Sequence, residues 1–211
     1  MPHPRSAAGV DPGLVPQVRG LESQWLEIRA EMEALPAGSF KPWPQHDHRF
    51  MSGVLLSHYG RDLPVAARCP RTMAALRKLP NFVNAGFQSV AAGGHLLPHH
   101  GSTAGILRGL LPLTMSADGD NWIKVAGQKH VYREGEVFLL LDTSLHEVRN
   151  ESSVSRTVLA FDLWLPMRVP GDRLRRIKHR IAARFLRKRS AVMEFKKQHY
   201  EDGDGRAPDD R

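Results

Sequence analysis

The sequence has one cysteine, no long apolar run and no internal repeat, and each absence excludes a class of protein. Cys69 cannot form an internal disulfide, so it is expected to be a buried structural thiol in a reducing compartment. Nowhere do about 18 uncharged apolar residues follow one another, and residues 1–13 lack the apolar segment of a signal peptide. We therefore predict a cytoplasmic protein without a membrane span, and no solenoid.

The length allows one sizeable hydrophobic core. A chain of 211 residues with 41% hydrophobic content is typical of one domain with terminal extensions. We expect a flexible N-terminus over residues 1–13 and a single domain over residues 14–170. A helix over 171–199 and a disordered tail over 200–211 complete the chain.

The net charge of +8 is concentrated near the C-terminus. Residues 172–197 hold eleven Lys or Arg against two acidic residues, so the rest of the chain is close to neutral. The predicted basic helix is open to three interpretations: a solvated helix, a contact with an anionic membrane surface, or a dock for an acidic partner. A nucleic-acid interface is disfavoured, because Phe185 and Phe195 are the segment's only aromatic residues.

The pattern of apolar residues predicts one N-terminal helix followed by many strands. Between residues 14 and 35 apolar side chains recur at steps of three and four, as in an amphipathic helix. Between residues 82 and 166 short β-branched and aromatic runs alternate with turn residues. A mainly β fold follows, either a sandwich, a jelly roll or a barrel, over about residues 45–166, with helices flanking it at both ends.

Two histidines and two arginines occur at similar intervals in the strand region. His99 precedes Arg108 by nine residues, and His146 precedes Arg156 by ten. Two imidazoles suit iron, zinc, copper or nickel, so the histidines alone do not identify the metal. Arg156 begins an apolar run where a charge is costly to bury without an anionic partner, and a guanidinium binds a carboxylate in a bidentate fork. This set of residues predicts a site for iron and 2-oxoglutarate.

The same segments resemble the aspartyl/asparaginyl β-hydroxylase family of iron(II)/2-oxoglutarate oxygenases, which includes bacterial lipid A hydroxylases. The resemblance covers about residues 85–166, and "LESQWLEIRAEMEAL" is similar to the helix that commonly precedes the family's catalytic domain. The matching positions are Pro98, His99, Gly101, Arg108, Glu134, Gly135, Asp142, Thr143, His146, Glu147, Arg156, Asp162, Trp164 and Pro166.

The resemblance implies a fold, an activity and roles for residues. The fold is a double-stranded β-helix, that is, a jelly roll or cupin-like core, and the activity is hydroxylation with iron(II), 2-oxoglutarate and dioxygen. The resemblance implies that His99 and His146 are iron ligands. It also implies that Arg156 binds the distal 2-oxoglutarate carboxylate and that Arg108 assists Arg156 in this binding. Gly101 stands where many related oxygenases have a ligating carboxylate, and this family is similarly known for lacking it.

The chain also departs from the family pattern at positions near the cosubstrate. Leu110 stands where members often have a histidine, and Gln88 where a serine is common. Gln88, Ser89 and Thr103 are the polar residues expected to substitute for them. Leu141 replaces the first Asp of an Asp-Asp pair. We expect these departures to alter the choice of substrate and not to abolish activity.

The substrate stays open at this level. The resemblance suggests the β-carbon of an aspartyl or asparaginyl unit, as a small molecule, in a peptide or tethered to a carrier, and alternatively a lipid acyl chain. A non-catalytic metal-binding jelly roll is the rival from another class. His95 and His100 are interpreted as a loop residue and an exposed neighbour, because successive strand residues face opposite ways. Trp122 is expected in the core.

Overall fold

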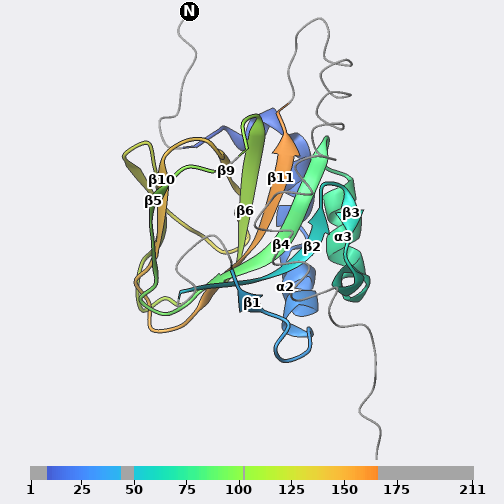
Figure 1. Cartoon of the computed structure of the whole chain (residues 1–211), viewed down its shortest axis with the longest axis horizontal. Coiled ribbons are helices and arrows are strands. Elements are labelled where there is room, and N and C mark those ends of the chain that lie inside the picture. The colour runs from blue at the N-terminus through green and yellow to red at the C-terminus, as the bar shows by residue number, and fades with distance from the viewer. Residues whose placement is uncertain (1–8, 44–49, 102, 166–211) are drawn as a thin grey trace, which may run out of the picture. The chain divides into compact units, whose positions relative to one another are not determined.

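Two antiparallel sheets and a helical layer make up the molecule, seen side by side in Figure 1. The computed structural model describes residues 9–43, 50–101 and 103–165, all within one compact unit. The predicted mainly β, jelly-roll class is confirmed. The predicted basic helix over 171–199 and the tail over 200–211 lie outside the described residues.

The larger sheet has seven strands, in the order β1-β2-β4-β11-β6-β9 with β3 paired to β2. Its strands are β1 (Lys41–Pro42), β2 (Met51–His58), β3 (Arg61–Asp62), β4 (Phe82–Val90), β6 (Ile106–Thr114), β9 (Phe138–Leu141) and β11 (Arg156–Trp164). The smaller sheet has the order β5-β10-β7-β8. Its strands are β5 (His95–His99), β7 (Asn121–Val125), β8 (Gln128–Val131) and β10 (His146–Asn150).

Within the described residues the helical elements all precede β4. They are the short 3₁₀ helices η1 (Pro12–Leu14), η2 (Pro16–Val18) and η3 (Pro64–Arg68) and the α-helices α1 (Arg19–Glu22), α2 (Trp25–Glu33) and α3 (Pro70–Arg77). None of the helices within the described ranges is long and apolar enough to cross a bilayer.

The helix predicted over residues 14–35 is interrupted at Ser23 and Gln24. The side chains of both residues donate hydrogen bonds to the carbonyl oxygen of Gly20, at 3.2 and 2.7 Å. Such bonds compete with the regular helical ladder, so the segment forms two helices instead of one. The apolar stripe is nevertheless buried from Val18 to Met32.

The N-terminal segment begins against the sheet. The backbone N–H of Val10 donates to the Leu139 carbonyl of β9 at 2.8 Å, so the described part of residues 1–13 contacts the domain.

Alternation along the strands divides the larger sheet into an apolar and a polar face. Leu159, Phe161 and Leu163 of β11 join the core cluster with residues of α1, α2 and α3. Arg156 and Asp162 lie on the opposite face of β11, because side chains an even number of residues apart point the same way. The hydrophobic core therefore lies between this sheet and the helices, and the face toward the smaller sheet carries the predicted site.

Candidate functional site

His99 and His146 lie next to each other on adjacent strands of the smaller sheet. They are Cα partners between β5 and β10, and their ring centroids are 4.3 Å apart. The Nδ1 of each ring is 2.7 Å from the carbonyl oxygen of the residue two positions earlier. A neutral imidazole that donates through Nδ1 carries its lone pair on Nε2, the arrangement typical of a metal-binding histidine.

The protonation state of His146 suits a metal ligand. Its pKa is lowered to about 4, mainly by burial; the neighbouring His99 and Arg108 also lower it, and a hydrogen bond with the Ser144 carbonyl acts in the opposite direction. His146 is 5% exposed and therefore neutral at pH 7. Because a metal competes with protons for imidazole nitrogen, a histidine that stays neutral binds without a protonation penalty.

The Asp142 carboxylate occupies the space beside Gly101. A Cβ atom added to Gly101 would overlap this carboxylate, and Gly101 N–H donates to the Asp142 carbonyl at 2.7 Å. A side chain at position 101 and the present position of Asp142 are thus mutually exclusive. A carboxylate at this place comes from Asp142, just before β10, instead of from a residue two positions after His99.

Arg108 joins two buried carboxylates across the polar face of the larger sheet. Its NH1 lies 2.6 Å from Asp142 Oδ1, and its Nε donates to Asp162 Oδ1 at 2.9 Å. Asn84 Nδ2 also donates to Asp162, at 3.0 Å. Burial alone would lower the pKa of Arg108, but Asp162 and Asp142 outweigh it and raise that pKa. Burial raises the pKa of Asp142, and Arg108 opposes this.

Arg156 is a buried cation on the same sheet. It is 2% exposed, and within the described ranges no carboxylate forms an ion pair with it. Its Nε has no hydrogen-bond partner there, and its Cζ lies 4.9 Å from the ring centroid of Tyr132. Burial lowers its pKa, against the influence of Tyr132. Such a cation is costly unless an anion joins it, so the site can bind a carboxylate.

The other predicted cosubstrate residues are distributed around this polar face. Gln88 is half-buried on β4, between Gly53 and Val158 in the sheet register. The backbone N–H of Thr103 hydrogen-bonds the Asp142 carboxylate and lowers its pKa. The roles of Gln88, Thr103 and Arg108 toward 2-oxoglutarate stay predictions.

The two histidines that neighbour His99 in the sequence, His95 and His100, have backbone or surface partners. His100 Nδ1 lies 2.9 Å from the Thr143 carbonyl oxygen, and His95 Nε2 lies 3.2 Å from Glu147 on the smaller sheet. The expectation that Trp122 lies in the core is wrong. It is half-buried, with Lys129 5.3 Å from its ring centroid, because it alternates with the buried Ile123.

Sequence reasoning missed the polar partners of these residues. Asn84 and Tyr132 are not marked by any motif, and Asp162 is marked only as a position that matches the family pattern. Only the register of β4, β11 and β6 places Asn84 opposite Asp162 and Asp162 opposite Arg108.

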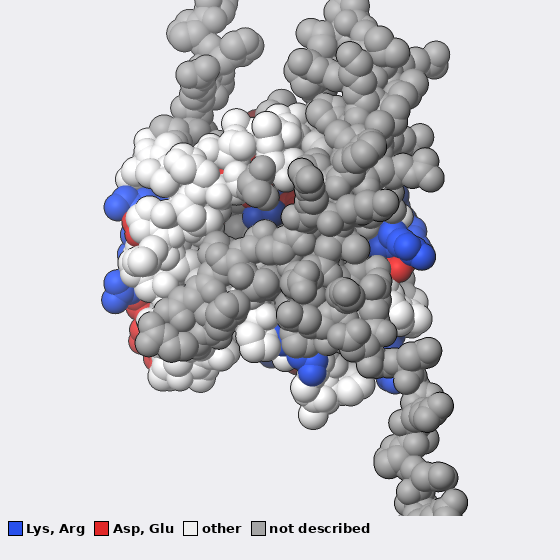
Figure 2. All heavy atoms as spheres, viewed as in Figure 1, with Lys and Arg blue, Asp and Glu red and all other residues white. Residues whose placement is uncertain are grey.

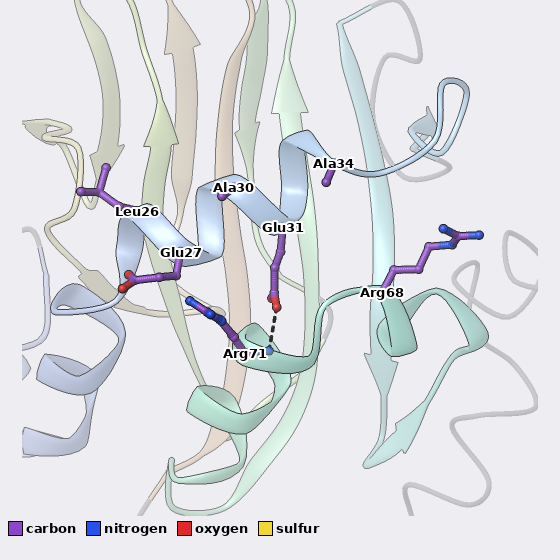
Figure 3. Close-up of a pocket in the computed structure, with 7 residues that line it drawn as sticks. All are labelled: Leu26, Glu27, Ala30, Glu31, Ala34, Arg68 and Arg71. Atoms are coloured by element: carbon purple, nitrogen blue, oxygen red, sulfur yellow. Dashed lines mark hydrogen bonds between the residues drawn. The ribbon is translucent and has the colours of Figure 1, made fainter.

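A second concave region lies on the helical side of the molecule, away from the two histidines. Figure 3 shows this pocket between α2 and the segment that begins α3, with a volume of about 480 Å³. Its lining combines two arginines and two glutamates with the exposed Leu26 and small residues of α2. Glu31 accepts hydrogen bonds from Arg71 and Thr72 there, so it caps α3. By contrast, basic and acidic atoms are visible near the centre of the face viewed in Figure 2.

Comparisons with known proteins find relatives of this chain by sequence. The model of the family "Aspartyl/Asparaginyl beta-hydroxylase" matches residues 22–166. The ornithine lipid ester-linked acyl 2-hydroxylase of Rhizobium tropici is 30% identical over 173 residues, which cover 76% of this chain and 62% of that protein. Human aspartyl/asparaginyl beta-hydroxylase is 28% identical over 172 residues, which cover 76% of this chain and 23% of that protein.

Solved structures align less extensively. A 2OG-Fe(II) oxygenase family oxidoreductase from Burkholderia pseudomallei aligns with a TM-score of 0.47 and 16% identity, over 67% of this chain and 78% of that one. The chain spans less than two thirds of the length of the two curated relatives described above. The family model covers more than half of the chain and includes both histidines and both arginines of the site. The chain therefore belongs to the aspartyl/asparaginyl beta-hydroxylase family.

Proposed function

We propose that the chain is an iron(II)- and 2-oxoglutarate-dependent hydroxylase. The observation that carries this proposal is the pair His99 and His146, whose rings lie 4.3 Å apart with both Nδ1 atoms engaged by backbone carbonyls. The family membership supports the same activity. Two imidazole ligands would suit iron(II).

The residues present also fit 2-oxoglutarate. Arg156 is buried without a carboxylate partner in the described part of the chain, and it would hold the distal carboxylate in a bidentate fork. Arg108 is held by Asp162 and Asp142, so its guanidinium is oriented before any ligand binds. When bound, iron with 2-oxoglutarate and dioxygen supplies the oxidation that converts a C–H bond into C–OH.

The substrate class we propose first is an aspartyl or asparaginyl unit hydroxylated at its β-carbon, free, in a peptide or tethered to a carrier. The family description and the human relative support it. A lipid acyl chain is the second candidate, because the Rhizobium relative, at 30% identity, is named an acyl hydroxylase. The basic residues 172–197 suit either an acidic carrier or an anionic lipid surface.

Anaerobic absorbance spectroscopy tests the metal and cosubstrate assignment. Iron(II) and 2-oxoglutarate should together give a metal-to-ligand charge-transfer band, which His146→Ala should abolish. His100→Ala is the matched control, since this neighbour of His99 contacts the Thr143 carbonyl, and it should keep the band. If the wild type shows no band, the oxygenase proposal is wrong.

Succinate formation then distinguishes the substrates. We expect an aspartyl- or asparaginyl-containing peptide to stimulate oxygen-dependent conversion of 2-oxoglutarate to succinate and to gain one oxygen atom by mass spectrometry. Stimulation by an ornithine lipid in its place would select the acyl substrate. A non-catalytic metal-binding module would form no succinate with either compound.

A further inference from the structure

Tyr132 and Arg156 approach each other from different sheets. Tyr132 follows β8 of the smaller sheet and Arg156 begins β11 of the larger one. The Tyr132 backbone N–H donates to the Asn121 carbonyl at 2.8 Å, and Phe138 packs edge-on against the phenol ring with centroids 6.4 Å apart. The ring is therefore held from two sides, with its face 4.9 Å from the guanidinium carbon of Arg156.

Both side chains have a buried polar atom without a partner. The Tyr132 hydroxyl and Arg156 Nε have no hydrogen bond of normal geometry within the described residues, and the two residues are 4% and 2% exposed. The hydroxyl and the guanidinium are nevertheless close enough to act on each other's pKa, so the two groups lie at the same place. Buried polar groups are almost always hydrogen-bonded, so two neighbouring exceptions indicate a ligand. Because guanidinium N–H groups donate and one of the two groups is cationic, the ligand must offer acceptor atoms and negative charge, as a carboxylate does.

The sequence also lacks a donor that members of the family often have here. Leu110 replaces the histidine expected two residues after Arg108, and it is 6% exposed and apolar. Leu110 is the register partner of Phe138, whose ring contacts Tyr132. A phenol from the opposite sheet is thus available beside the apolar Leu110 and next to the Arg156 guanidinium.

The phenol is a donor at every physiological pH. Burial raises the pKa of Tyr132 to about 12, although the Arg156 cation acts in the opposite direction. The hydroxyl therefore keeps its proton and can donate it to a carboxylate oxygen.

We propose that Tyr132 is a cosubstrate-binding residue whose hydroxyl donates a hydrogen bond to the distal carboxylate of 2-oxoglutarate beside Arg156. This inference rests on the proposed function. It adds a contact from the smaller sheet to a carboxylate otherwise held by the larger one, and it accounts for the orphaned hydroxyl.

The test compares two oxo acids in wild type and Tyr132→Phe. Binding to the anaerobic iron(II) protein is followed by the charge-transfer band, with 2-oxoglutarate and with 2-oxopentanoate, which lacks the distal carboxylate. We expect Tyr132→Phe to weaken 2-oxoglutarate binding about tenfold or more, because a hydrogen bond to a charged group is lost. The affinity for 2-oxopentanoate should not change.

Three outcomes separate the explanations. A selective loss of 2-oxoglutarate affinity, with an unchanged thermal unfolding midpoint of the ligand-free variant, supports the proposal. Equal weakening of both oxo acids, or no weakening of either, overturns it and assigns Tyr132 a structural role. The absence of the band in the wild type would instead refute the oxygenase assignment itself, so the two failures are distinguishable.

Discussion

Replacing Arg156 by methionine should remove cosubstrate binding without destabilising the ligand-free protein. For most buried side chains a substitution lowers the free energy of unfolding. Arg156 differs because it is a cation that is 2% exposed, and none of the described carboxylates pairs with it. Methionine keeps an unbranched apolar stem of similar reach and removes the charge.

The expected magnitude follows from two opposing contributions. Desolvating an unpaired cation costs several kcal/mol, and contact with the Tyr132 ring at 4.9 Å returns about 2 kcal/mol. Methionine removes the desolvation cost of the cation and also loses the contact between the cation and the ring. Because the desolvation cost is the larger of the two, the ligand-free variant should be more stable than the wild type by about 1 kcal/mol. In a domain of this size that raises the unfolding midpoint by about 2–4 °C.

Thermal unfolding with and without 2-oxoglutarate provides the assay, under anaerobic conditions with iron(II). At a ligand concentration of about 100 times Kd the wild type should gain about 2.7 kcal/mol, and Arg156→Met should gain nothing. Arg133→Met is the control, because its side chain is 76% exposed and should respond to ligand as the wild type does. A ligand-free Arg156→Met protein that unfolds well below the wild type would show that the cation is internally compensated and would refute the reasoning.

Three further changes probe the core and the helical layer. Gly109→Ala should lower the free energy of unfolding by about 1–3 kcal/mol in urea titrations, because the new Cβ overlaps the buried ring of Phe161. Burial raises the pKa of the Cys69 thiol from 9.0 to about 11, so stability should fall as pH rises from 9 to 11, and a thiol reagent should react only on unfolding. Glu31→Ala should cost about 1–2 kcal/mol, since its carboxylate accepts from Thr72 N and Oγ1 at the start of α3.

Matched substitutions decide whether these reasons are correct. Gly20→Ala places a Cβ in open space within α1 and should be neutral or stabilising, so a loss equal to that of Gly109→Ala would count against the overlap. Glu27→Ala, one turn before Glu31 on α2, should have little effect. A Cys69 thiol that reacts rapidly in the native protein at pH 8 would contradict its burial.

The strands and the candidate ligands were accessible from sequence because both depend on local spacing. Short β-branched and aromatic runs marked β6 and β11, and the intervals from His99 to Arg108 and from His146 to Arg156 matched a known pattern. In contrast, α3 was not predicted, because its N-terminal N–H groups are capped by Glu31, about 40 residues earlier in the chain. A cap supplied by a distant residue leaves no local signal.

What the sequence determined by itself was the family and the mainly β class, together with candidate residues for binding a metal and a carboxylate, since these follow from residue type and interval. Tertiary structure alone decided which charges are compensated. Asp142 and Asp162 reach Arg108 from other strands, and none of the described carboxylates reaches Arg156. Desolvation and pairing depend on neighbours brought together from distant parts of the chain. Of two arginines at similar intervals in the sequence, Arg108 is therefore paired with two carboxylates, whereas Arg156 has no carboxylate partner among the described residues.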